Sequence, residues 1–206
     1  FWSEKDHGED LYALKSANLN RPIPGAAREV YDVPHATPWG KMIASYLWTK
    51  SVSAGVLLLA ALFLNMGFEQ DAVLLNVISP ALSLLFLAAT MVLLVLDLKK
   101  PTRFFFLLTK PNLNSWLVLG GYVLMIFGLL LAFWLFQIYT QDRVSPWVIW
   151  PAALFAIASA GYSAFLFAQA RGRDFWQSPL LFWHLLVKAV LAGAAMLILI
   201  GSLELV

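Results

Sequence analysis

The sequence contains no cysteine and few charged residues. Without cysteine, the chain cannot form an internal disulfide, a thiolate-bound iron–sulfur cluster or a cysteine-ligated zinc site. Charged residues make up 13% of the 206 residues and hydrophobic residues 61%, whereas a soluble domain has about 25% charged residues. We therefore predict a membrane protein. A net charge of +2, with no basic patch interleaved with aromatics, indicates no nucleic-acid partner.

Histidines and carboxylates are scarce within the apolar segments. Of the three histidines, only His184 lies in such a segment, and one histidine cannot ligate even one bis-histidine haem. No carboxylate falls in the middle of an apolar segment, which counts against a proton pump or ion transporter. The sequence predicts no metal, haem or iron–sulfur cluster in this chain.

Five apolar segments are each close to the roughly 20 residues that a helix needs to cross a bilayer. We predict an all-α membrane protein in which residues 39–206 form a bundle of about five transmembrane helices, preceded by a polar, proline-rich tail over residues 1–38. Because the chain starts without methionine, we expect it to be trimmed at its N-terminus. The predicted helices are Trp39–Met66, Ala72–Leu96, Ser115–Tyr139, Trp147–Ala170 and Pro179–Leu203.

A strongly basic connection follows the second predicted helix. It carries Lys99, Lys100 and Arg103, whereas the preceding connection carries Glu69 and Asp71 and no cation. By the positive-inside rule, the tail and the connections 97–114 and 171–178 lie in the cytoplasm. A basic connection can equally form a docking surface for a soluble partner, so both readings stay open.

Polar residues gather at one depth in three predicted helices. Counted from the basic face at about 1.5 Å per residue, Lys50, Tyr162 and Lys188 each lie about 14 Å deep. His184 lies one turn from Lys188 on the same helix face. Each residue alone also fits a simpler reading, with lysines reaching the headgroups and Tyr162 packing against a neighbouring helix. The sequence does not give the direction in which each side chain points, so a shared pocket stays open.

These residue types suit an amphipathic quinone. A quinone head has two carbonyl oxygens that accept hydrogen bonds, and its reduced form loses protons on oxidation. Tyrosine, histidine and lysine supply donors and exchange protons, while aromatic and aliphatic walls hold the ring and its tail.

Several short motifs, taken together with their order along the chain, resemble one family of membrane proteins. Residues 97–104 read DLKKPTRF, followed by PNLNSW at 111–116, which opens the next helix. The resemblance continues in YLWTK at 46–50, GYSAFL at 161–166 and GRDFWQSPLLFWH at 172–184. Together these segments resemble the NrfD/PsrC family, whose members are the membrane subunits of polysulfide reductases and related complexes.

The resemblance implies a four-helix-bundle core plus one further helix, similar to about the first five helices of a family that usually has eight or more. Such subunits carry no redox cofactor of their own. They bind menaquinol or ubiquinol near one membrane face, beside a [4Fe-4S] iron–sulfur partner and often a molybdopterin catalytic subunit. The implied location is a bacterial or archaeal inner membrane, and the implied role is that of a subunit rather than a self-sufficient enzyme.

We therefore expect a quinone-interacting membrane anchor that exchanges electrons with an iron–sulfur partner. The alternative is an assembly or anchor protein with no quinone site. Asp97 is a candidate proton relay, although a helix-end ion pair explains it equally well. The candidate quinone-binding residues are Lys50, Tyr162, His184, Lys188 and Trp48, and the candidate docking residues are Lys99, Lys100 and Arg103.

Overall fold

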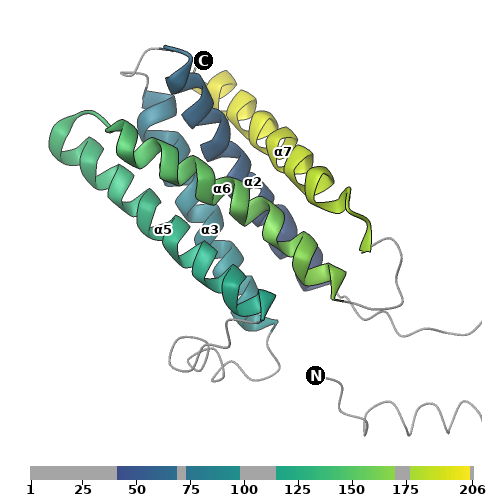
Figure 1. Ribbon diagram of the computed structural model, residues 1–206. Coiled ribbons are helices and arrows are strands. Elements are labelled where there is room, and N and C mark those ends of the chain that lie inside the picture. Colours follow the sequence, from purple (N-terminus) through teal and green to yellow (C-terminus); the bar gives the residue numbers. More distant parts are fainter. Residues whose placement is uncertain (1–40, 69–72, 98–114, 170–176, 205–206) are drawn as a thin grey trace, which may run out of the picture. The chain divides into compact units, whose positions relative to one another are not determined.

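The computed structural model describes residues 41–68, 73–97, 115–169 and 177–204, and these ranges are helical with no strand. Within these ranges, five helices are long and apolar enough to cross a membrane, which confirms the predicted fold class. Each helix end lies within two residues of its prediction. The predicted tail over residues 1–38 lies outside the described residues. The elements, side by side in Figure 1, are α2 (Lys41–Asn65), the π-helical turn η1 (Leu74–Ile78), α3 (Ser79–Leu96), α5 (Trp116–Gln141), α6 (Pro146–Ala168) and α7 (Leu181–Glu204).

A short turn joins α5 to α6. Asp142 ends α5 in the left-handed conformation, with φ of 54°, which aspartate tolerates better than most residues. Pro146 then starts α6 at a position where its missing N–H is not needed. The Gln137 amide donates to the Ser145 hydroxyl at 3.0 Å, and its oxygen accepts the Ser145 backbone N–H at 3.2 Å. These bonds close the turn and set α6 beside α5.

Pro80 explains the π-helical turn at the start of α3. Proline has no N–H to donate to the carbonyl four residues earlier, and its ring crowds that carbonyl. The Asn76 carbonyl is therefore available to another donor, and it accepts the indole N–H of Trp134 on α5 at 3.2 Å. The Ser79 backbone N–H and hydroxyl both donate to Leu74 O, the hydroxyl at 2.7 Å. Pro80 thus produces a π turn that ties α3 to α5.

The central helix is α2, which contacts α3, α6 and α7. In α2, 61% of the most apolar stretch is buried inside the bundle, whereas in α7 the buried share of that stretch is 22%. Close approach of α2 and α7 depends on glycine, because a Cβ at Gly55 would collide with the Ala189 carbonyl, and one at Gly193 with the Gly55 backbone. Small residues at such crossings are typical of membrane helices. Gly120 and Gly161 allow similar close contacts, because a Cβ there would overlap the rings of Tyr162 and Phe182.

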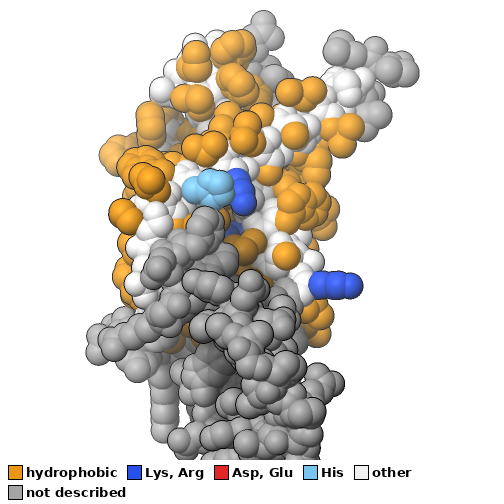
Figure 2. Space-filling model, turned by 90° about the vertical axis from the view of Figure 1, so that its right-hand side faces the viewer, with side chains coloured by type: hydrophobic (Ala, Val, Ile, Leu, Met, Phe, Trp, Pro, Cys, Tyr) orange, Lys and Arg blue, Asp and Glu red, His pale blue; other side chains and the backbone are white. Residues whose placement is uncertain are grey.

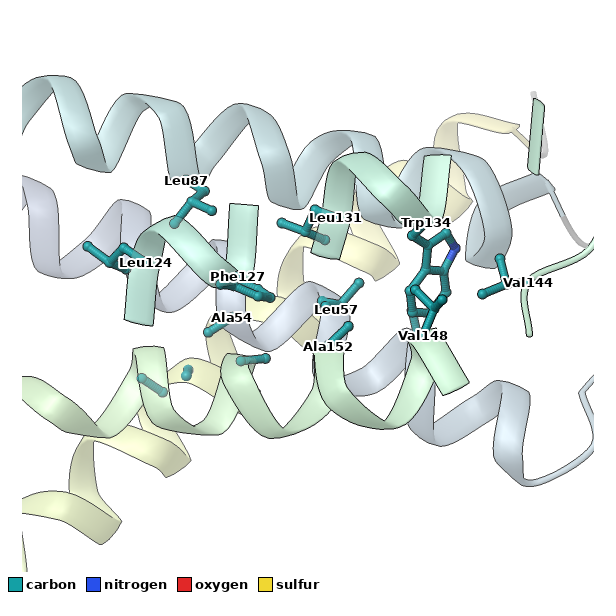
Figure 3. Close-up of a cluster of buried hydrophobic side chains, with 14 of the residues drawn as sticks. Ala54, Leu57, Leu87, Leu124, Phe127, Leu131, Trp134, Val144, Val148 and Ala152 are labelled. Carbon is teal, nitrogen blue, oxygen red and sulfur yellow. The ribbon is translucent and has the colours of Figure 1, made fainter. Parts of the chain in front are cut away.

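The apolar core lies between α2, α3, α5 and α6 (Figure 3). Leu57 of α2, Phe127 and Leu131 of α5 and Ala152 of α6 are fully buried, and Leu87 of α3 is nearly so. In a bilayer this packing stabilises mainly through van der Waals contact, since lipid tails are as apolar as leucine. The core holds the inner faces of the helices together, and on α2 and α6 it continues directly into a polar cluster.

Candidate functional site

Lys50 lies fully enclosed within the helix bundle. Its side chain is 1% exposed, although it stands nine residues, or about 14 Å, into α2. Its Nζ donates a hydrogen bond to the Ser163 hydroxyl of α6 and lies 4.4 Å from the ring centroid of Tyr162, also on α6. Of the candidate quinone-binding residues, the structure therefore brings Lys50 and Tyr162 together.

The polar face of α6 follows from helical spacing. Ser159, Tyr162 and Ser163 stand at i, i+3 and i+4 and share one face, and all three are buried. The Tyr162 ring fits because Gly120 of α5 has no side chain, since a Cβ there would overlap the ring. The sequence of α6 thus places two hydroxyls and a phenol on one buried face, and Gly120 of α5 leaves room for the phenol.

Tyr46 joins this cluster from α2, one turn before Lys50. It is 3% exposed, and its hydroxyl interacts with the Ser163 side chain and with Tyr162. It also lies within electrostatic range of Asp97, an exposed residue that caps the end of α3. Tyr46 is therefore the member of the cluster that senses the charge of the candidate proton relay Asp97.

The electrostatics of the cluster are unusual because its cation has no carboxylate partner among the described residues. The carboxylates whose side chains the structure describes, Asp97 and Asp142, are both exposed, and no ion pair forms within the described ranges. An unpaired buried charge is costly unless hydrogen bonds compensate it. Ser163 and the face of the Tyr162 ring supply that compensation, which makes the cluster rich in donors and cationic when Lys50 is protonated.

Hydroxyl groups fasten α2 to α3 next to the cluster. Ser53 and Ser83 each donate to the other's backbone carbonyl, both at 2.8 Å. One turn closer to the cluster, Thr90 of α3 donates to the Thr49 hydroxyl at 2.8 Å. All four side chains are buried, so this interface fixes the rotation of α2 and keeps Lys50 directed toward α6.

The remaining candidate quinone-binding residues lie on the outside of the bundle. His184 and Lys188 are exposed on α7, and Figure 2 shows a histidine and a lysine side by side on a mostly hydrophobic face. Trp48 is 57% exposed and meets Phe86 of α3 edge-on, with ring centroids 5.7 Å apart. The structure does not bring these three residues to the Lys50 ammonium. The docking candidates Lys99, Lys100 and Arg103 lie outside the described residues.

Sequence reasoning missed Tyr46 and Ser163 as members of the cluster. Tyr46 lies four residues before Lys50, so helical spacing alone places the two on one face. Ser163 directly follows Tyr162 in the GYSAFL segment at 161–166. A search for polar residues adjacent to each candidate or one turn from it would have found both.

The fold and the cluster define a multi-pass helical membrane protein with a buried lysine near one end of its bundle and, within the described residues, no group of side chains that could hold a metal ion. The sequence matches the family model described as "Polysulphide reductase, NrfD" over residues 29–204, and the chain belongs to this family. Membership indicates a membrane subunit of a reductase complex. No match was found among curated proteins.

Proposed function

We propose that this chain is the quinone-interacting membrane subunit of a multi-subunit oxidoreductase, with the quinone head bound beside Lys50 and Tyr162. The observation that supports this proposal is the buried lysine itself. An ammonium held about 14 Å inside a membrane helix, with no carboxylate partner among the described residues, is costly and marks a functional site by default. It fits an acceptor ligand that enters from the lipid phase.

The chemistry of the cluster matches that ligand. A quinone carbonyl oxygen can replace the Ser163 hydroxyl as the acceptor of a Lys50 N–H, which forms a charge-assisted hydrogen bond. The Tyr162 ring supplies an aromatic wall, and its hydroxyl a second donor. Either menaquinone or ubiquinone satisfies these contacts, because both present two ring carbonyls.

Oxidation of a quinol also releases protons, and the geometry suggests a route for them. Tyr46, in the cluster, lies within electrostatic range of Asp97, which is exposed at the end of α3. We propose that protons leave along this line to the face that carries the basic connection. The electrons would pass to a [4Fe-4S] partner docked on Lys99, Lys100 and Arg103, beside a molybdopterin subunit. This chain itself would lie in the inner membrane of a bacterium or archaeon.

The outward-facing candidates take a secondary place in this proposal. His184, Lys188 and Trp48 are exposed on the bundle, where an arriving quinone would pass them before its head reached Lys50. Because they are exposed and contact none of the cluster residues in the described part of the chain, their contribution to binding is expected to be small.

The alternative function, an anchor without a quinone site, is favoured by a different observation. Lys50 is 1% exposed and Ser163 is fully buried, so the cluster is closed among the described residues. In that case the Lys50–Ser163 bond serves only to join α2 to α6.

Measuring quinone-dependent electron transfer in the purified complex distinguishes a quinone-interacting subunit from an anchor without a quinone site. Lys50→Gln and Tyr162→Phe are expected to reduce it strongly if the head binds beside them. Lys41→Gln, at the exposed start of α2, is the matched control and is expected to retain it. Wild-type rates in Lys50→Gln and Tyr162→Phe would instead support the anchor.

A further inference from the structure

Ser159 carries a hydroxyl that is fully buried and has no hydrogen-bond partner among the described residues. Buried polar atoms almost always have a partner, so an orphaned one calls for an explanation. The other buried polar atom without a partner in the described part of the chain is the Asn76 amide nitrogen. It lies in the π turn at the start of α3. Ser159 lies on the face of α6 that carries Tyr162 and Ser163.

Helical spacing places Ser159 beside the cluster. It lies one turn from Ser163 along α6, or about 6 Å, and on the same face as Tyr162 and Ser163. Lys50 contacts both of those residues. Ser159 is therefore the next polar group of α6, one turn further toward the middle of the membrane.

The ammonium supplies the cluster with an excess of donors. A protonated lysine has three N–H groups and no acceptor, whereas each hydroxyl both donates and accepts. Ser163 accepts one N–H of Lys50, and the Tyr162 ring faces the ammonium. No described carboxylate is buried near them, because Asp97 and Asp142 are exposed. The group that best completes this site is one that only accepts hydrogen bonds.

The two redox forms of a quinone differ in this property. The oxidised head presents two carbonyl oxygens that only accept, whereas the quinol presents two hydroxyls that also donate. Resting on the proposed function, we propose that Ser159 is a quinone-binding residue that donates to a carbonyl oxygen of the head. The site thereby binds the oxidised quinone more tightly than the quinol.

This preference has a measurable redox consequence. Stabilising the oxidised form relative to the reduced form lowers the reduction potential of the bound couple. A tenfold preference lowers it by about 30 mV for two electrons. The bound quinol is then a stronger reductant than free quinol, which favours electron transfer from the membrane to the partner subunit.

The test compares dissociation constants for a short-chain ubiquinone and for its quinol in the purified complex. Ser159→Ala is expected to weaken binding of the quinone about tenfold, as the loss of one hydrogen bond allows, and binding of the quinol less than twofold. Because the variant removes an unpartnered hydroxyl, it is expected to fold at least as stably as the wild type. Ser51→Ala, whose hydroxyl bonds the Leu47 carbonyl at 2.7 Å, is the matched control and is expected to change neither constant.

Unchanged constants in Ser159→Ala would overturn the inference and assign the hydroxyl a packing role. Equal weakening of both forms would overturn the redox preference. Ser159→Thr, which keeps the hydroxyl, is expected to retain the preference, and its loss there would also count against the inference. If the wild-type complex binds neither form, the proposed function fails as well, so the two failures are distinguishable.

Discussion

Two lysines within the membrane-spanning helices occupy opposite environments. Lys50 stands nine residues into α2 and Lys188 seven residues into α7, or about 14 and 11 Å from the helix starts. Lys50 is 1% exposed and contacts two side chains of α6. Lys188 is exposed on the outer face of α7. Similar depth along a helix thus gives one enclosed cation and one that faces outward.

The difference shows what a helix bundle must supply to hold a cation inside. A lysine on the lipid face can extend its stem toward the headgroups and keep its charge in a polar region. Lys50 cannot do this, because α6 covers it and hydroxyl bonds between α2 and α3 fix the rotation of α2. The enclosed lysine therefore depends on its neighbours, and each of them offers a way to test the comparison.

The largest expected effect comes from replacing each of the two lysines by glutamine. Lys50→Gln is expected to reduce quinone-dependent electron transfer about 100-fold, since a lost charge-assisted bond costs up to about 3 kcal/mol. Lys188→Gln is expected to reduce it no more than about threefold, because an exposed lysine contributes little. Steady-state rates of the purified complex at saturating partner would measure both. Similar losses in the two variants would remove the distinction between the environments.

Lys50 and Lys188 also show how much of the candidate site the sequence predicted. Helix length and the rise per residue fixed the depth of Lys50, Tyr162 and Lys188, since both are properties of the backbone. The rotation of each helix depends on contacts between helices, such as the close approach of Gly55 and Gly193, which one sequence does not reveal. That is why the prediction grouped Lys188 with Lys50, and why it missed Tyr46.

The next largest effect is expected where α7 meets α2. A Cβ at Gly193 would collide with the backbone of Gly55, and overpacking of this kind costs about 2 kcal/mol. Gly193→Ala is therefore expected to separate α7 from α2 and to lower the thermal unfolding temperature in detergent. In Gly201→Ala on the same helix, the new Cβ would lie 3.8 Å from Leu74 Cδ2, so the better helix propensity of alanine should leave stability unchanged or raised. Equal unfolding temperatures in the two variants would show that the close approach is unimportant.

A smaller effect is expected from the glycine that positions Tyr162. A Cβ at Gly120 would overlap the Tyr162 ring, and moving the ring costs about 1.5 kcal/mol. Gly120→Ala is expected to displace the aromatic wall from Lys50 and to weaken quinone binding together with stability. In Gly128→Ala on the same helix, the nearest atom to the new Cβ would be Leu87 Cδ2 at 3.4 Å, and both properties should be retained. Normal quinone binding in Gly120→Ala would mean that the ring position does not matter to the site.

The smallest effect is expected at the hydroxyl bonds between α2 and α3. Ser53 and Ser83 exchange side-chain bonds with each other's carbonyls, and bonds between membrane helices contribute about 0.6 kcal/mol each. The double variant Ser53→Ala with Ser83→Ala is therefore expected to lose about 1 kcal/mol of stability in a denaturant titration. Ser45→Ala, which loses only an exposed bond to the carbonyl of Lys41 in its own helix, is expected to lose almost none. If these bonds fix the rotation of α2, the double variant should also make Lys50 accessible to a water-soluble amine reagent. Protection equal to that of the wild type would show that α6 alone encloses the lysine.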